Sequence, residues 1–321
     1  MRLTAVQNDR AAGVLVATAA GDALGAGYEF TYPRPDVPIE MIGGGLGPFA
    51  PGEWTDDTSM ALAIAEISAT GTPIEHGDGL DAIAAQFVRW YDTRPKDIGN
   101  QTRTVLQGCS PTAEAMQRKA RGLTGRTGGN GSLMRTAPVG IAHLDDSAAC
   151  LAAAREISAL THADPRAIEA CQLWSYAIRH AVLHGTFDGV RLALGELPAE
   201  PATYWRGLLD EAETAETAAV FHNNGWVVHA LQTAWWAIAH ADASGPEHLQ
   251  QALELAVRAG GDTDTTAAIA GGLLGARWGA SAVPARWQQM LHGWPGYRAS
   301  DLVDLALATA SGGRDESYSG A

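Results

Sequence analysis

The sequence predicts an all-α protein that folds as one unit, and three observations support this prediction. Apolar residues recur at helical spacing, as in Ile83, Phe87 and Trp90, which follow an i, i+4, i+7 stripe. No run of β-branched residues alternates with a period of two, as a half-buried strand would. No shift in composition divides the chain, and its two strongest acidic motifs lie near opposite ends. We therefore expect a single domain over residues 1–310 and a mobile tail over residues 311–321.

The composition fits a buried core and excludes several classes of function. The 321 residues are 46% hydrophobic and 18% charged. Lys and Arg number 22 against 36 Asp and Glu, a formal net charge of −14, so extended nucleic-acid binding is not expected. Three scattered cysteines do not make a disulfide framework or a zinc cluster. No apolar stretch reaches the roughly 20 residues that span a bilayer, and no signal peptide is evident, so we expect a cytoplasmic protein without membrane attachment.

Local signals along the chain indicate each element. An apolar helix over 11–21 precedes the stretch Thr31–Trp54, whose five prolines and five glycines predict an irregular loop. Helical patterns cover 81–90 and 225–240, and tryptophans at helical positions, Trp226 among them, are expected to pack in the core. Further on, three glycines share an i, i+4, i+8 spacing that lets a second helix approach closely: Gly271, Gly275 and Gly279.

Two acidic motifs each open a helical pattern. In the first, Asp56 and Asp57 lie between threonines, and in the second, Asp262 and Asp264 follow two glycines. The plain interpretation of either motif is a capped helix start, worth about 1 kcal/mol. Together they supply four carboxylates and several hydroxyls, hard oxygen ligands that suit Mg²⁺ or Mn²⁺. The absence of His and Cys from both motifs argues against zinc.

Other polar residues also stand out against their surroundings. A glycine-rich run enters a helical pattern at Ser132, where backbone amides can hold a diphosphate, although such a run is also a common turn. Asp22 lies within an apolar helix, and we expect it to act as structural support: holding a helix N-terminus, holding a metal-bound water or pairing with an arginine. We expect Arg135 to form a structural ion pair. No aromatic residue neighbours the glycine-rich run in sequence, so no adenine-stacking residue can be named.

Five stretches, taken in order, resemble the motifs of the ADP-ribosylglycohydrolase family. Any one of them alone would be a weak signal, whereas all five in family order, from about residue 10 to residue 280, are specific. They are Gly21–Gly25 with Glu29, Thr55–Thr58, Gly129–Arg135, Thr161-His162 and Gly260–Thr266.

The resemblance implies a compact orthogonal helical domain with a binuclear site for two Mg²⁺ or Mn²⁺ ions in a central cleft. By position, the implied metal ligands are Thr55, Asp56, Asp57, Asp262, Asp264 and Thr265. The implied catalytic residues are Glu29, a gating glutamate in some members, together with Asp56 and Asp57. The implied substrate-binding residues are Asp97, Gly99, Asn100, Gly128, Gly129, Asn130, Gly131, Ser132 and His162.

The expected function is metal-dependent cleavage of the glycosidic bond at ribose C1″ of an ADP-ribosylated protein, metabolite or nucleic-acid end, with release of ADP-ribose. Asp97 and Asn100 slightly favour an arginine linkage over serine, O-acetyl or nucleic-acid linkages. Two alternatives remain: a non-enzymatic ADP-ribose-binding or structural relative, and a metal-dependent hydrolase of another nucleotide or phosphoester. The region around His229 lacks an acidic residue that is common in some branches of the family, which leaves the leaving group open.

Overall fold

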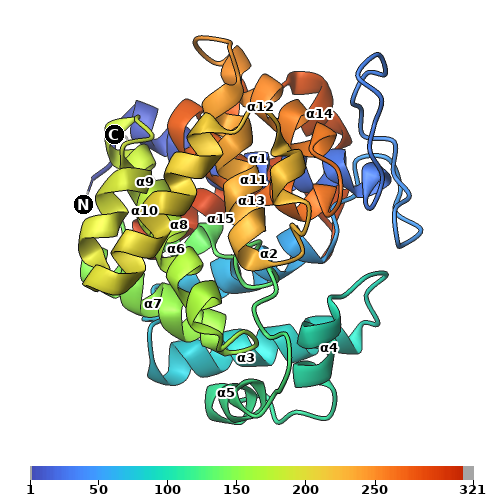
Figure 1. Ribbon diagram of the computed structural model, residues 1–321. Helices are drawn as coiled ribbons and strands as arrows, with labels where there is room; N and C mark the ends of the chain where they lie inside the picture. Colours follow the sequence, from blue (N-terminus) through green and yellow to red (C-terminus); the bar gives the residue numbers. More distant parts are fainter. Residues whose placement is uncertain (1, 314–321) are drawn as a thin grey trace, which may run out of the picture.

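The computed structural model describes residues 2–313, and over that range helices and loops make up almost the whole fold (Figure 1). The α-helices are α1 (Ala5–Gly25), α2 (Asp56–Ser68), α3 (Gly77–Asp92), α4 (Asn100–Leu106), α5 (Ala113–Arg121), α6 (Ala137–Ala142), α7 (Ser147–Ala159), α8 (Pro165–His184), α9 (Gly189–Leu192), α10 (Ala199–Thr214), α11 (Val227–His240), α12 (Glu247–Arg258), α13 (Thr263–Trp278), α14 (Ala285–Met290) and α15 (Ala299–Ser311).

The remaining regular elements are short. Strands β1 (His292–Gly293) and β2 (Tyr297–Arg298) form one antiparallel pair. The 3₁₀ turns are η1 (Ala26–Tyr28), η2 (Ala193–Glu196), η3 (Ala218–Phe221) and η4 (Ala280–Ala282). The all-α prediction is confirmed, because this two-residue pair is the only sheet within residues 2–313.

Two helices that are buried on all sides form the centre of the fold. In α1 every residue from Ala11 to Gly25 is buried, and in α13 every residue from Thr263 to Ala276. They pack backbone against backbone: a Cβ on Gly271 would lie 2.2 Å from the Ala17 carbonyl oxygen, and one on Gly275 would lie 1.9 Å from that of Gly13. The expected close approach at the glycine spacing is thus present, and its partner is α1.

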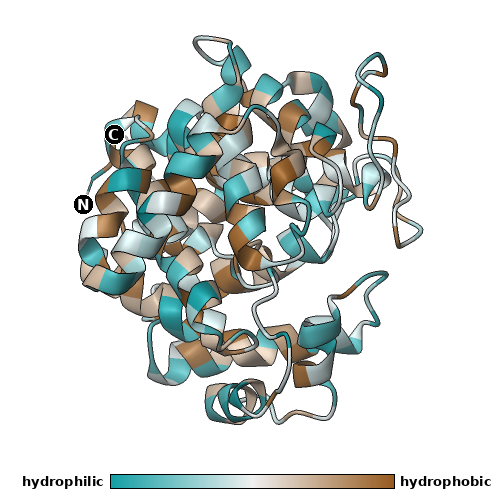
Figure 2. Ribbon diagram, viewed as in Figure 1, coloured by the Kyte–Doolittle hydropathy of each residue, from teal (hydrophilic) through white to brown (hydrophobic). Residues whose placement is uncertain are grey.

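Outer helices such as α3 and α12 are amphipathic, and their ribbons carry both hydrophobic and hydrophilic residues (Figure 2). In α3 the predicted stripe of Ile83, Phe87 and Trp90 is buried, while the polar face is exposed. The stretch 31–54 is irregular, as predicted, and follows the end of η1 along one side of the molecule (Figure 1). No helix in the described range combines the length and the apolar character needed to cross a membrane.

One detail differs from the sequence predictions, and another prediction lies partly outside the described residues. The expected helix at Ser132 is absent: residues 131–135 form turns and α6 begins only at Ala137, because Pro138 fits the first turn of a helix and not its interior. Helix α15 runs to Ser311, and from residue 314 the tail predicted for 311–321 lies outside the described residues.

Candidate metal centre and ligand cavity

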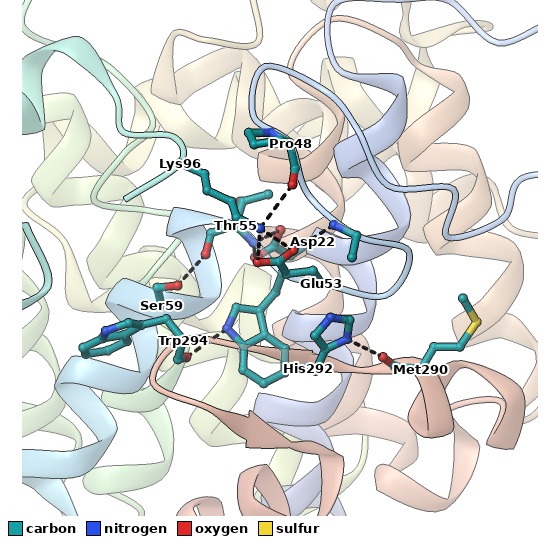
Figure 3. Close-up of polar contacts among 11 residues, drawn as sticks. Asp22, Pro48, Glu53, Thr55, Ser59, Lys96, Met290, His292 and Trp294 are labelled. Atoms are coloured by element: carbon teal, nitrogen blue, oxygen red, sulfur yellow. Dashed lines mark hydrogen bonds and ion pairs between the residues drawn. The ribbon is translucent and has the colours of Figure 1, made fainter. Parts of the chain in front are cut away.

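The end of α1 brings the two acidic motifs together. Asp22, completely buried near that end, accepts hydrogen bonds from the backbone amides of Thr55 (2.9 and 3.1 Å) and Thr58 (3.0 Å) and from the Thr58 hydroxyl (2.6 Å). The Asp22–Thr55 contact is visible in Figure 3. On the opposite side, the Thr263 hydroxyl donates to the Gly25 carbonyl at 2.9 Å. Asp22 therefore holds a helix N-terminus, one of the structural roles expected of it.

Because Asp22 caps α2 from another helix, the first motif's own side chains are released from capping. Thr55 is the N-cap residue of α2, yet its side chain makes no capping hydrogen bond. Three buried oxygens find no hydrogen-bond partner among residues 2–313: Thr55 Oγ1 and Asp57 Oδ2 in the first motif and Asp264 Oδ1 in the second. A buried polar atom without a partner costs free energy. Helix capping alone therefore does not explain these residues.

The second motif is positioned by two asparagines. Asn130 Nδ2 donates to Asp262 Oδ2 at 2.7 Å and to the Asn224 carbonyl at 2.9 Å. The Asn224 side chain in turn accepts from the Asp262 amide at 3.0 Å and donates to the Gly260 carbonyl at 2.8 Å. As in α2, the N-cap residue of α13, Asp262, makes no side-chain capping bond. The two motifs meet where Thr265 Oγ1 lies 3.4 Å from Asp57 Oδ1.

Burial and mutual repulsion raise the pKa values of these carboxyl groups. Burial, followed by repulsion from neighbouring aspartates, raises the pKa of Asp56 to about 7 and that of Glu29 to about 8. For the same reasons the pKa values of Asp57 and Asp264 lie well above their usual range. Burial also raises the pKa of Asp262, against hydrogen bonds that lower it. Within residues 2–313 none of these five carboxyl groups forms a salt bridge.

The donor set fits divalent cations that prefer oxygen ligands. Asp22, Asp57 and Asp264 can offer oxygens within 4.8 Å of one another, and so can Glu29, Asp262 and Asp264. Asp264 belongs to both groups, as a ligand bridging two ions would. The partnerless oxygens of Thr55, Asp57 and Asp264 are of the same chemical type. We conclude that these residues could hold Mg²⁺ or Mn²⁺.

The carboxylates face an open cavity of about 490 Å³. It is enclosed by residues from α2, α4, α13 and the connecting loops. Of the residues predicted from the sequence, those lining it are Glu29, Asp56, Asp57, Asp97, Gly99, Asn100, Gly129, Asn130, Gly131, His162, Asp262, Asp264 and Thr265. Asp97 accepts from the Ile98 amide at 2.7 Å and does not cap α4, whose N-cap residue is Gly99.

Three residues predicted for the site lie outside this cavity. Thr55 lines a neighbouring cavity of about 310 Å³, which shares Asp56 and Asp97 with the central one. Gly128 lines a second neighbour of about 440 Å³. Ser132 is buried, and its hydroxyl accepts a hydrogen bond from Ser158 at 2.9 Å.

Trp226 is a wall residue that sequence reasoning missed. It is half-buried and lines the 440 Å³ cavity, with its Nε1 3.3 Å from where a Cβ on Gly128 would lie. Residues Gly129 and Trp226 form an isolated β-bridge, and the Val227 amide donates to the Gly128 carbonyl at 2.9 Å. Trp226 packs against the hydrophobic core, as expected, and pairing across a long sequence separation also brings it to the glycine-rich loop.

Arg135 also differs from expectation. It is fully buried and forms no salt bridge within residues 2–313, so the predicted ion pair is wrong. Its guanidinium instead donates to the Thr161 hydroxyl at 2.7 Å and the Ile157 carbonyl at 3.2 Å, and lies 4.5 Å from the Phe87 ring centroid. Its Nε finds no hydrogen-bond partner in the described part of the chain. Burial lowers the Arg135 pKa to about 10, so the group remains a cation at neutral pH.

Fold and site together define a helical protein with a buried oxygen-rich centre beside an open cavity of about 490 Å³. The chain belongs to the ADP-ribosylglycohydrolase family, whose pattern it matches over residues 3–316. This confirms the resemblance predicted from the five motifs.

Individual relatives agree with this assignment. The chain is 32% identical to the ADP-ribosylarginine hydrolase Tri1 of Pseudomonas putida (strain GB-1), over 87% of this chain and 73% of the relative. It is 28% identical to the ADP-ribosyl-[dinitrogen reductase] glycohydrolase of Rhodospirillum rubrum, over 94% and 97% of the two chains. A solved structure titled ADP-ribosylglycohydrolase-related protein complex aligns with a TM-score of 0.72 and 29% identity, covering 96% of this chain and 99% of that one.

Proposed function

We propose that this protein hydrolyses the bond between ribose C1″ and the group attached to it in an ADP-ribosylated substrate, releasing ADP-ribose. The observation that carries the proposal is the set of buried partnerless oxygens on Thr55, Asp57 and Asp264 beside a cavity that also contains the glycine-rich loop. Such oxygens suit divalent cations. A glycine-rich loop exposes backbone amides to phosphate oxygens.

The substrate would lie along the 490 Å³ cavity and the neighbouring 440 Å³ cavity. The ribose that carries the leaving group would occupy the carboxylate end, near Asp264. The diphosphate would follow the Gly129–Gly131 backbone past His162. The adenosine would extend into the 440 Å³ cavity and stack on Trp226, since the two cavities share Gly129 and Gly225.

Thr55, Asp56, Asp57, Asp262, Asp264 and Thr265 would hold two ions. When bound, Mg²⁺ or Mn²⁺ supplies Lewis acidity toward ribose hydroxyls and water. The protein's own groups would manage the protons. Asp56 or Asp57 would accept a proton from the water that attacks C1″. Glu29, which lines the cavity beside these groups, would give a proton to the leaving group as the C1″ bond breaks.

We favour an arginine linkage. Asp97 and Asn100 line the cavity near Asp56, whose Oδ2 accepts a weak hydrogen bond from the Gly99 amide at 3.4 Å. A carboxylate in this place suits a guanidinium group. The Pseudomonas putida relative is named an ADP-ribosylarginine hydrolase, which agrees with an arginine linkage. The Rhodospirillum rubrum relative is named an ADP-ribosyl-[dinitrogen reductase] glycohydrolase, which agrees with hydrolysis of an ADP-ribosyl bond.

The test measures ADP-ribose release from ADP-ribosyl-arginine, ADP-ribosyl-serine, O-acetyl-ADP-ribose and ADP-ribosylated nucleic acid, with Mg²⁺, Mn²⁺ or EDTA. We expect metal-dependent release that is fastest from the arginine conjugate. Asp97→Asn should slow that substrate roughly tenfold, the loss of one charge-assisted hydrogen bond, without changing the affinity for free ADP-ribose. Binding of ADP-ribose without release from any substrate would support a binding protein, and release of AMP a phosphoester hydrolase.

A further inference from the structure

Arg135, Thr161 and His162 form a buried chain of hydrogen bonds behind the glycine-rich loop. One guanidinium nitrogen, Nη2, lies 2.7 Å from Thr161 Oγ1 and 3.2 Å from the Ile157 carbonyl oxygen. The same Thr161 hydroxyl lies 2.8 Å from His162 Nδ1. All three side chains are at most 2% exposed. The chain therefore connects a buried cation to the imidazole that lines the central cavity.

The positions of the hydrogens in this chain follow from the inventory of donors. Arg135 has only donors, so Thr161 Oγ1 must accept from it. A hydroxyl has one hydrogen, and the only acceptor within reach of Thr161 Oγ1 among the described residues is His162 Nδ1. If Nδ1 carried the hydrogen instead, the Thr161 hydroxyl would be a buried donor without a partner, which is costly. Nδ1 is therefore the acceptor, and the neutral ring carries its hydrogen on Nε2.

The opposite edge of the ring faces the glycine-rich loop. A Cβ on Gly129 would lie 3.4 Å from His162 Nε2, and one on Gly131 would lie 3.2 Å from it and 2.9 Å from Cε1. Nε2 makes no hydrogen bond to any residue in the described range, although the ring belongs to the cavity wall. Burial and the charge of Arg135 lower the pKa of His162 to about 3, so the ring stays neutral. A neutral ring with Nε2–H is a fixed donor.

We propose that Arg135 and Thr161 are positioning residues that hold His162 in its Nε2–H form, so that this nitrogen donates a hydrogen bond to a phosphate oxygen of bound ADP-ribose. The phosphate contact rests on the proposed function, whereas the tautomer does not. The positive charge of Arg135, unpaired within residues 2–313, adds attraction for an anion in the cavity. His162 is thus assigned to binding and not to proton transfer.

The experiment records ¹⁵N shifts of the histidine rings between about pH 5 and pH 8, where an ordinary histidine titrates. The His162 signals are assigned by their loss in His162→Gln. We expect neutral Nε2–H signals at every pH in the wild type and in Thr161→Ser, which keeps the hydroxyl. Thr161→Val should populate the Nδ1–H form and weaken ADP-ribose binding, measured by calorimetry, about three- to tenfold. Thr161→Ser should keep both the Nε2–H form and the wild-type affinity for ADP-ribose.

The possible failures are distinguishable. An Nδ1–H ring or an imidazolium in the wild type overturns the positioning role, and this spectrum decides it even if Thr161→Val does not fold. A shifted tautomer in Thr161→Val with unchanged ADP-ribose affinity overturns the phosphate contact. A wild type with the expected tautomer that binds no ADP-ribose at all overturns the phosphate contact together with the proposed function, while the arrangement of Arg135 and Thr161 stands.

Discussion

The two walls of the central cavity differ in their charge and therefore in the charge of the ligand that each would bind. On one wall Glu29, Asp56, Asp57, Asp262 and Asp264 are crowded together without a salt bridge to any residue of the range 2–313, and burial raises their pKa values. The other wall contains the glycine-rich loop and neutral His162, with the cation of Arg135 buried behind it. The first wall is suited to cations and the second to an anion.

The difference in charge between the two walls indicates which kind of ligand would fit the central cavity. A ligand that joins metal-coordinating hydroxyls to a diphosphate would satisfy both walls at once, and ADP-ribose is such a molecule. A simple metal ion would satisfy only the carboxylate wall, and a free nucleotide phosphate only the other. Variants that act on one wall and spare the other can therefore separate metal binding from ligand binding.

Asp264→Asn should have the largest effect, because Asp264 belongs to both carboxylate groups of the first wall. We expect hydrolysis to fall roughly 10²- to 10⁴-fold, which corresponds to the loss of several kcal/mol of metal-assisted stabilisation. We also expect Mg²⁺ to raise the melting temperature of the wild type and to leave that of the variant unchanged. Without metal, the variant should melt above the metal-free wild type at about pH 8, since the free-energy cost of burying the Asp264 carboxyl group among other carboxyl groups is gone.

Asp304→Asn is the matched control, because Asp304 is exposed on α15, away from the cavity. It should keep wild-type hydrolysis and the full Mg²⁺ effect. Undiminished hydrolysis in Asp264→Asn would remove the carboxylate wall from the mechanism. A metal-free melting temperature below that of the wild type would show that the Asp264 charge is compensated in the folded protein.

The metal-free protein should lose stability as the pH rises from about 4 to about 8. The folded-state pKa values of Asp22, Asp56 and Glu29 are raised to about 6, 7 and 8, above their usual values near 4. The folded state therefore binds more protons than the unfolded state in this window, and its stability decreases with rising pH. Saturating Mg²⁺ should flatten this slope. Melting curves in EDTA and in Mg²⁺ provide the measurement, and a rise in EDTA would contradict the prediction.

Sequence reasoning predicted the acidic wall well because its signal is local. Asp56 and Asp57 stand side by side, Asp262 and Asp264 two residues apart, and each pair opens an apolar helix. The periodicity of α3 and the glycine spacing in α13 were likewise readable from short windows. The local pattern could not decide whether these aspartates cap their helices or bind metal ions. The group that caps α2 is the carboxylate of Asp22, which comes from another helix.

The second wall could be predicted only in part, because its contacts join distant segments. Trp226 reaches the glycine-rich loop through the Gly129–Trp226 bridge, which no sequence window contains. Asn224 positions Asp262, although in sequence its Asn-Gly pair indicates only a turn. Arg135 was expected to find a carboxylate, and it is bound by Thr161, Ile157 and an aromatic ring instead.

Gly131→Ala tests the second wall alone. The added methyl would lie 2.9 Å from His162 Cε1, so the ring must move, and we expect ADP-ribose affinity to fall about tenfold, as when one hydrogen bond to a charged group is lost. The Mg²⁺ effect on melting should be unchanged. Gly207→Ala, where a methyl meets nothing within 4 Å, should leave affinity intact and stabilise α10 by about 0.5–1 kcal/mol. Equal affinity in the two variants would show that His162 is free to move without cost to binding.

The smallest effect is expected where the irregular loop joins the carboxylate wall. Lys96 Nζ lies 2.7 Å from both Glu53 carboxylate oxygens and 3.1 Å from the Pro48 carbonyl, which ties the loop to the segment of Asp97 (Figure 3). Such partly exposed pairs contribute less than about 1 kcal/mol. Lys96→Met should therefore raise KM about two- to fivefold through a looser loop, with kcat unchanged.

Arg34→Met is the control for this last comparison, because the Arg34 side chain pairs with Asp36 inside the same loop and forms no other polar contact within residues 2–313. Its KM should equal that of the wild type. If both variants raised KM equally, loss of positive charge near an acidic cavity would be the cause and the tie between loop and wall would not matter. If only Lys96→Met raised KM, and the effect persisted in high salt, the attachment of the loop would be what shapes the carboxylate side of the cavity. Salt separates the two causes because it screens the exposed Arg34 charge more strongly than the ion pair of Lys96 with Glu53, whose side chain is 17% exposed.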